Sequence, residues 1–113
     1  MPAHRWLVMQ ASNSGQVGRA ALSAAWAREE EGERRMDYLW GASLSAEEDT
    51  REFLLEVVMS PEAFDYERIY AADRLARMGP TPMVAPILKR ACLGITDAVV
   101  RPAFEELLWT WYG

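Results

Sequence analysis

The sequence has little of the residues on which most enzymatic and metal sites depend. Its 113 residues include one cysteine, Cys92, and one histidine, His4. A lone cysteine cannot form a disulfide within the chain, so nothing points to an oxidising compartment and a reducing cytoplasm is expected. Histidine chemistry would depend on His4 alone, near a terminus expected to be mobile. We therefore expect no catalytic site, no cofactor and no bound metal.

Long apolar runs and an excess of basic residues are also missing. The apolar stretch from Trp6 to Gln10 is too short for a signal-peptide core or a membrane span. With 12 basic against 17 acidic residues, the net charge is −5, which does not suit a nucleic-acid binder. The acidic excess is local, because residues 29–62 hold eleven acidic and three basic side chains. Neither a membrane nor nucleic acid is expected as a partner.

What the sequence does contain is a series of helix signals. Half of its residues are apolar, enough for one core in a chain of this length. No segment alternates in the way of a half-buried strand, so we predict one all-α domain of five to six helices in antiparallel pairs. The first three predicted helices are 16–31, 33–40 and 46–59. A fourth begins at Asp65 and ends at Gly79, and a fifth begins at Pro82 with Thr81 as its cap. The last is capped by Thr96 or Asp97.

Local patterns predict how some of these helices end and pack. Ser45 and Glu48 have the spacing of a capping box, and Pro61 ends the helix that follows. Gly41 suits a left-handed cap after the short second helix. A stripe of small residues in the first helix predicts close contact with a neighbouring helix: Val17, Ala20, Ala21, Ala24 and Ala25.

An internal repeat is the most specific signal. The segment from Arg68 to Leu75 recurs 32 residues later, so that Ala71 corresponds to Ala103 and Leu75 to Leu107, and Asp65 to Asp97. The pattern resembles short HEAT repeats, of the kind also found in phycobilisome lyases, over roughly residues 46–113. This resemblance implies a short α-solenoid, with residues 45–113 as repeats and residues 1–44 as an N-terminal helical cap or addition.

The resemblance also implies where a partner would bind. In HEAT-like stacks the second helices of successive pairs line the inner face, here 46–59 and 83–93. The polar side chains expected on that face are Glu48, Arg51, Glu52, Glu56, Lys89 and Arg90. Asp65 with Arg68 and Asp97 with Arg101 could form surface pairs worth only ~0.3–0.5 kcal/mol each, so we interpret them as caps rather than sites.

The aromatic end of the chain offers a second candidate surface. Trp109 and Trp111 are ~200° apart on a helix, so both cannot face one core. Either Trp109 or Tyr112 packs on the preceding helix pair, or a large ring stays at the surface as a docking edge for another subunit.

These observations favour a non-catalytic protein–protein interaction module, acting as an adaptor, inhibitor or assembly subunit on a partner with a mixed or basic surface. One alternative is a small lyase-like enzyme or accessory factor with a pocket between the N-terminal helices and the repeats. No acid, base and nucleophile are brought together by helical spacing, which weighs against it. A third possibility is an obligate structural subunit that self-associates through its last helix.

Overall fold

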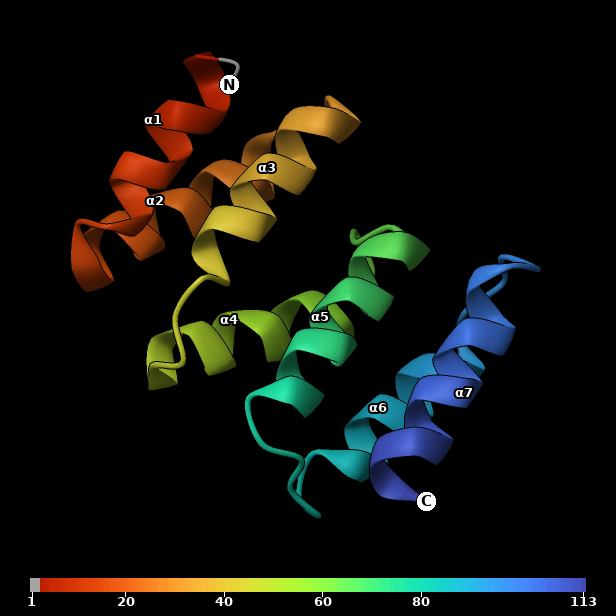
Figure 1. Ribbon diagram of the computed structural model, residues 1–113. Helices are drawn as coiled ribbons and strands as arrows, with labels where there is room; N and C mark the ends of the chain where they lie inside the picture. Colours follow the sequence, from red (N-terminus) through yellow and green to blue (C-terminus); the bar gives the residue numbers. More distant parts are fainter. Residues whose placement is uncertain (1–2) are drawn as a thin grey trace. The chain divides into compact units, whose positions relative to one another are not determined.

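Helices are the only regular secondary structure in residues 3–113, which are the residues that the structure, a computed structural model, describes (Figure 1). They are α1 (Ala3–Ser12), α2 (Gly15–Arg28), α3 (Gly32–Ala42), α4 (Glu48–Met59), α5 (Asp65–Arg77), α6 (Ala85–Leu93) and α7 (Val100–Tyr112). The all-helical prediction is confirmed, but the predicted number of helices is wrong. The additional helix is α1. Its Trp6 and Leu7 side chains are exposed, and Val8 is buried.

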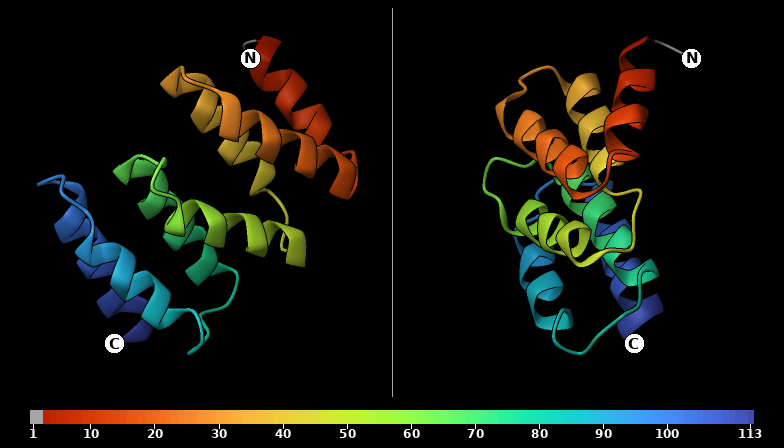
Figure 2. Two further views of the ribbon diagram at one scale, coloured as in Figure 1. Left: turned by 180° about the vertical axis from the view of Figure 1, so that it is seen from behind. Right: turned by 90° about the vertical axis from the view of Figure 1, so that its left-hand side faces the viewer.

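The chain divides into two compact units, residues 1–53 and 54–113, and the division falls inside α4. In the first unit α1, α2 and α3 each contact the other two (Figure 2). In the second unit α7 contacts both α5 and α6. The predicted organisation, one domain with an N-terminal addition up to residue 44, stays a prediction.

Two glycines let α1 approach its neighbours closely. A Cβ on Gly18 of α2 would lie only 2.7 Å from the carbonyl carbon of Ala11, so the backbones meet there. Gly41 of α3 lies against Val8, and a Cβ on it would also come within 3.0 Å of the Leu22 side chain. The prediction that Gly41 is a left-handed cap is wrong, because Gly41 lies inside α3 and its φ is not positive.

The predicted contact face of α2 is also wrong. Most of the predicted stripe is exposed, namely Val17, Ala20, Ala21 and Ala24. The buried face carries Leu22 and Trp26 instead, and the Trp26 ring packs edge-to-face on Phe53 with the ring centroids 5.6 Å apart. A tryptophan ring buries far more apolar area than an alanine, so the helix turns that side inward.

The core of the second unit forms between α5 and α7. On α5 the buried small and apolar residues are Ala71, Ala72, Leu75 and Ala76. On α7 they are Phe104 and Leu107. Ala103, which the repeat relates to Ala71, is exposed, because α7 turns the adjacent Phe104 inward. The 32-residue spacing therefore relates Ala72 to Phe104 and Leu75 to Leu107.

An ion pair in the first unit joins α2 to α4. Arg19 donates from Nε to Asp49 Oδ2 at 2.6 Å and from Nη2 to Asp49 Oδ1 at 3.0 Å. These bonds from Arg19 hold the pKa of the Asp49 carboxyl below its ordinary value. A depressed folded-state pKa means that the carboxylate stabilises the fold above its unfolded pKa, and that this contribution disappears as the pH falls through the folded pKa.

Acid should therefore remove the difference in folding stability between the native chain and the variant Asp49→Asn. At neutral pH the variant is expected to be the less stable of the two in urea unfolding. The gap should begin to shrink near the ordinary carboxyl pKa of about 4 and should close as the pH falls through the lowered pKa of the native Asp49 carboxyl. Asp73→Asn, in the exposed pair with Arg77, is the control and should show a smaller gap at neutral pH. A gap for Asp49→Asn that stays constant with pH would contradict this assignment.

Candidate functional site

A groove of about 600 Å³ lies in the second unit between the end of α4 and α6. It is lined by Val58 and Met59 of α4, Arg68 of α5, and Pro86, Ile87, Arg90 and Ala91 of α6. Five of these seven residues are apolar and the other two are arginines. The groove therefore presents an apolar surface together with cationic groups and no carboxylate.

The register of α6 leaves part of its apolar surface open to the groove. Val84, Leu88 and Cys92 are spaced one turn apart and are buried. Ile87 and Ala91 lie beside that stripe and are half-buried. The apolar side chains of α6 are therefore divided between the core and the groove, because an apolar arc wider than the contact with neighbouring helices leaves one edge uncovered.

The start of α6 differs from the prediction in a way that shapes one wall of the groove. The prediction that this helix starts at Pro82 with Thr81 as its cap is wrong, since α6 begins at Ala85 and residues 82–84 form a turn. Pro86 is then in the first helical turn, where its missing N–H costs no helical hydrogen bond. Its ring is consequently free to line the groove.

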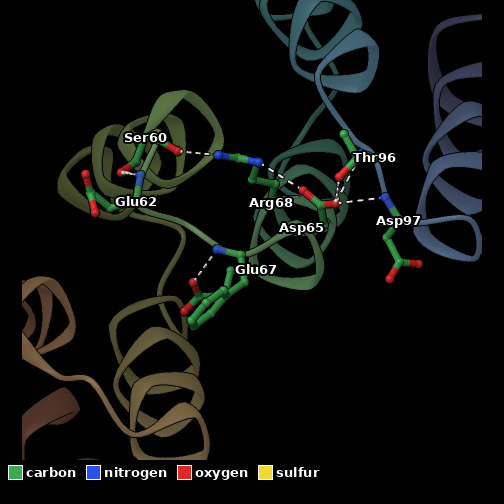
Figure 3. Close-up of polar contacts among 8 residues, drawn as sticks. Ser60, Glu62, Asp65, Glu67, Arg68, Thr96 and Asp97 are labelled. Carbon is green, nitrogen blue, oxygen red and sulfur yellow. Dashed lines mark hydrogen bonds and ion pairs between the residues drawn. The ribbon is translucent and has the colours of Figure 1, made fainter.

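Arg68 is held in place from two sides (Figure 3). Its Nη2 donates to the Ser60 carbonyl at 2.8 Å, and its Nη1 donates to Asp65 Oδ1 at 3.0 Å. Asp65 Oδ2 in turn accepts from the backbone N–H groups of Thr96, at 3.2 Å, and Asp97, at 3.0 Å. The network joins the turn after α4 to the turn before α7, and it fixes the arginine that lines the groove.

The predicted role of Asp65 as the cap of its own helix is wrong. Asp65 is the first residue of α5, and its carboxylate binds backbone 31 and 32 residues further along the chain. The residue before it, Phe64, has its N–H bound instead by the Glu67 side chain at 2.9 Å. Asp65 therefore links α5 to the turn before α7, in addition to its pair with Arg68 of the same helix.

Asp97 does cap the last helix, as one of the two predicted alternatives. Its Oδ1 accepts from the N–H groups of Val99 and Val100 at 2.8 and 2.9 Å, and these bonds hold its pKa below the ordinary value. The predicted pair of Asp97 with Arg101 is wrong, because Arg101 pairs with Glu105 at 3.3 Å. Val99, the residue before α7, is 80% exposed.

The two predicted partner-binding residues on α6, Lys89 and Arg90, are exposed cations. Arg90 lines the groove, and Lys89 is exposed next to it but does not line it. Within residues 3–113 neither side chain has a hydrogen bond or ion pair. Their charges are therefore available to an external group.

The four predicted residues on α4 are not brought to this groove. Glu48, Arg51 and Glu52 belong to the first unit, and Glu48 pairs with Arg51 at 3.9 Å. Glu56 is exposed in the second unit and does not line the groove. The apolar wall of the groove consists of residues that are not among the predicted partner-binding residues. The signal in the sequence that could have indicated them is the position of the apolar residues Met59 and Pro86 at helix ends.

The two tryptophans of α7 take different environments. Trp109 is 75% exposed, so it does not pack on the preceding helices. Trp111 is half-buried, and the guanidinium of Arg77 lies 5.9 Å from its ring centroid. Trp109 therefore remains a candidate docking residue and Trp111 contributes to packing against α5.

The remaining candidates for chemistry take structural positions. Cys92 is buried, and desolvation raises the pKa of its thiol, which keeps it protonated and poorly nucleophilic at neutral pH. His4 lies within α1 rather than in an irregular terminus, and its Nδ1 is 3.1 Å from Asp37 Oδ2. In the part of the chain that the structure describes, no three His, Cys, Asp or Glu residues are grouped as metal ligands would be.

Comparisons with protein-family models, with curated proteins and with solved structures found no match to this chain. The resemblance to HEAT repeats therefore stays a prediction. Over residues 3–113 no helix combines the length and the apolar character needed to cross a membrane.

Proposed function

We propose that this chain is a non-catalytic interaction module that holds a segment of another protein in the groove between α4 and α6. The observation that carries the proposal is the apolar surface left open there, with Met59 59% exposed beside half-buried Ile87. Open apolar surface of this kind is a usual feature of protein-binding sites, and a groove between helices accepts the apolar side of a peptide or helix. The module could serve as an adaptor, an inhibitor or an assembly subunit.

We also propose that the helices form HEAT-like pairs, α2 with α3, α4 with α5, and α6 with α7. In this pairing α4 and α6 are the first helices of their pairs, whereas the sequence predicts them as second helices. Support comes from burial that recurs along the chain. Leu39 and Ala42 of α3 are buried, as are Ala72 and Leu75 of α5, at a spacing of 33 residues. Arg35 and Arg68 have the same spacing, and each donates to a backbone carbonyl near the end of the preceding helix, at Trp26 and Ser60 respectively.

Loss of the exposed Met59 side chain should disrupt the proposed function. We expect Met59→Asn to weaken capture of the partner by about tenfold, because an apolar contact at the groove is replaced by a polar amide. The measurement is affinity capture by the tagged chain from a lysate of its native cells, with quantification of each captured protein across variants.

The matched control is Met83→Asn, which makes the same replacement at a methionine that is 85% exposed and does not line the groove. A captured protein that is lost with Met59→Asn and kept with Met83→Asn supports the proposal. Equal capture by all three chains rules the groove out.

The exposed ring of Trp109 favours a second candidate, the obligate structural subunit. In the same capture experiment the variant Trp109→Ser distinguishes the two candidate functions. A captured protein that is lost with Trp109→Ser and kept with Met59→Asn would bind at the exposed face of α7 instead of the groove. The small-enzyme alternative has no comparable support from the described residues. The cytoplasm stays the predicted location, because Cys92 is a free and buried thiol.

A further inference from the structure

The groove has the opposite charge to the chain that contains it. The chain carries 17 acidic against 12 basic residues, yet the groove lining includes Arg68 and Arg90 and no acidic residue. Lys89 adds a further cation beside it. On a protein of net charge −5, such a site is a local reversal of the surrounding potential.

The two arginines of the groove differ in what they can offer a ligand. Arg68 is already committed to Asp65 and to the Ser60 carbonyl, and its side chain is only 17% exposed. Arg90 is exposed and, among residues 3–113, has no hydrogen-bonding or ionic partner. The charge available to an occupant of the groove is therefore that of Arg90.

We propose that the occupant is a segment of another protein that combines apolar side chains with a carboxylate placed to pair with Arg90. This inference rests on the proposed function and adds the partner's chemistry to it. The apolar side chains would cover Met59, Ile87 and Ala91, and covering them would exclude water from the guanidinium. A carboxylate suits the Arg90 guanidinium because this planar group can donate two parallel hydrogen bonds, one to each carboxylate oxygen.

The surroundings argue against the main competing occupants. A nucleic acid needs many cations along a path, whereas this groove offers one open arginine and a neighbouring lysine on a chain of net charge −5. A basic or neutral apolar segment would cover Arg90 without a counter-ion, which costs the desolvation of an unpaired charge. The acidic residues of α4 predict a partner with a mixed or basic surface, whereas the groove itself favours an acidic segment.

The test is selection of a library of random displayed peptides on the immobilised native chain, followed by binding measurements with the enriched peptides. We expect apolar peptides enriched in Asp and Glu. Arg90→Glu should weaken their binding by about tenfold or more, since it replaces an attraction with a repulsion at a water-excluded site. Raising the salt concentration should weaken the native interaction only in part, because a covered pair is screened less than an exposed one.

Lys89→Glu is the matched control, since it makes the same charge change on the neighbouring exposed residue, which does not line the groove. We expect less than about a threefold effect from it. An equal loss with both variants would show general charge attraction and overturn the inference. Replacing the acidic residue of an enriched peptide with lysine should restore binding to Arg90→Glu.

The remaining outcomes separate this inference from the function on which it rests. Enriched peptides that bind through Met59 but have no acidic bias would overturn the acidic partner and leave the interaction module standing. Enriched peptides that bind Met59→Asn and the native chain equally would overturn both. A native chain that is dimeric by light scattering and monomeric as Arg90→Glu would place a second copy of this chain in the groove instead of a separate partner.

Discussion

Asp65→Ala is expected to lower the free energy of unfolding of the second unit by about 2–4 kcal/mol. The carboxylate accepts from Arg68, Thr96 and Asp97 at once. Its removal leaves a guanidinium that is 17% exposed without its counter-ion, and two backbone N–H groups of an exposed turn with water in place of the carboxylate. Urea unfolding followed by circular dichroism measures the loss.

The same helix offers a matched control for that replacement. Asp73 also pairs with an arginine, Arg77 at 2.8 Å, but both side chains are well exposed, at 37% and 59%. Asp73→Ala should therefore cost less than about 0.5 kcal/mol. If the two alanine variants lose similar stability, the network around Asp65 contributes no more than an ordinary surface pair.

The behaviour of Asp65 shows one limit of the sequence as a guide. Sequence spacing relates Asp65 to Arg68 and predicts a weak pair within one helical turn. It carries no sign that the carboxylate also binds the backbone before α7, because that contact depends on how α5 and the α6–α7 turn pack. We therefore expect the distant partners of Asp65 to make its stabilising effect larger than the pair with Arg68 alone predicts.

Among the helix boundaries, the end of α4 follows most directly from local chemistry. The predicted helix 46–59 corresponds to α4, Glu48–Met59, whose last residue is identical to the prediction because Pro61 follows. At its start the Ser45 hydroxyl accepts from the Glu47 N–H at 3.0 Å, in place of the full predicted capping box. Such signals act over a few residues, which is why one sequence is enough to find them.

The faces of the helices were harder to predict than their ends. Alanine and valine at helical spacing in α2 predict a contact face, yet Val17 is exposed and Trp26 is buried. The side that faces inward is chosen by the total apolar area that neighbouring helices can cover, and this depends on residues as distant as Phe53. The same reasoning explains the groove, since Ile87 is apolar in sequence and becomes a site only where no helix covers it.

Gly18→Ala is expected to destabilise the first unit by about 1–3 kcal/mol, although alanine is the better helix former by about 1 kcal/mol. The added Cβ would collide with the Ala11 carbonyl group, and a backbone group can move away only if α1 moves with it. Thermal and urea unfolding of the variant measure the effect.

Gly94→Ala makes the same replacement where the added carbon has room. Its φ is −85°, which alanine adopts readily, and its Cβ would lie 3.4 Å from the Ala91 carbonyl oxygen. Stability within about 0.5 kcal/mol of the native chain, or slightly above it, is expected because alanine reduces the freedom of the unfolded chain. Because the two variants share the unfolded-state effect, their difference isolates the cost of separating α1 from α2. A Gly18→Ala chain as stable as Gly94→Ala would mean that α1 does not pack closely on α2 at Gly18.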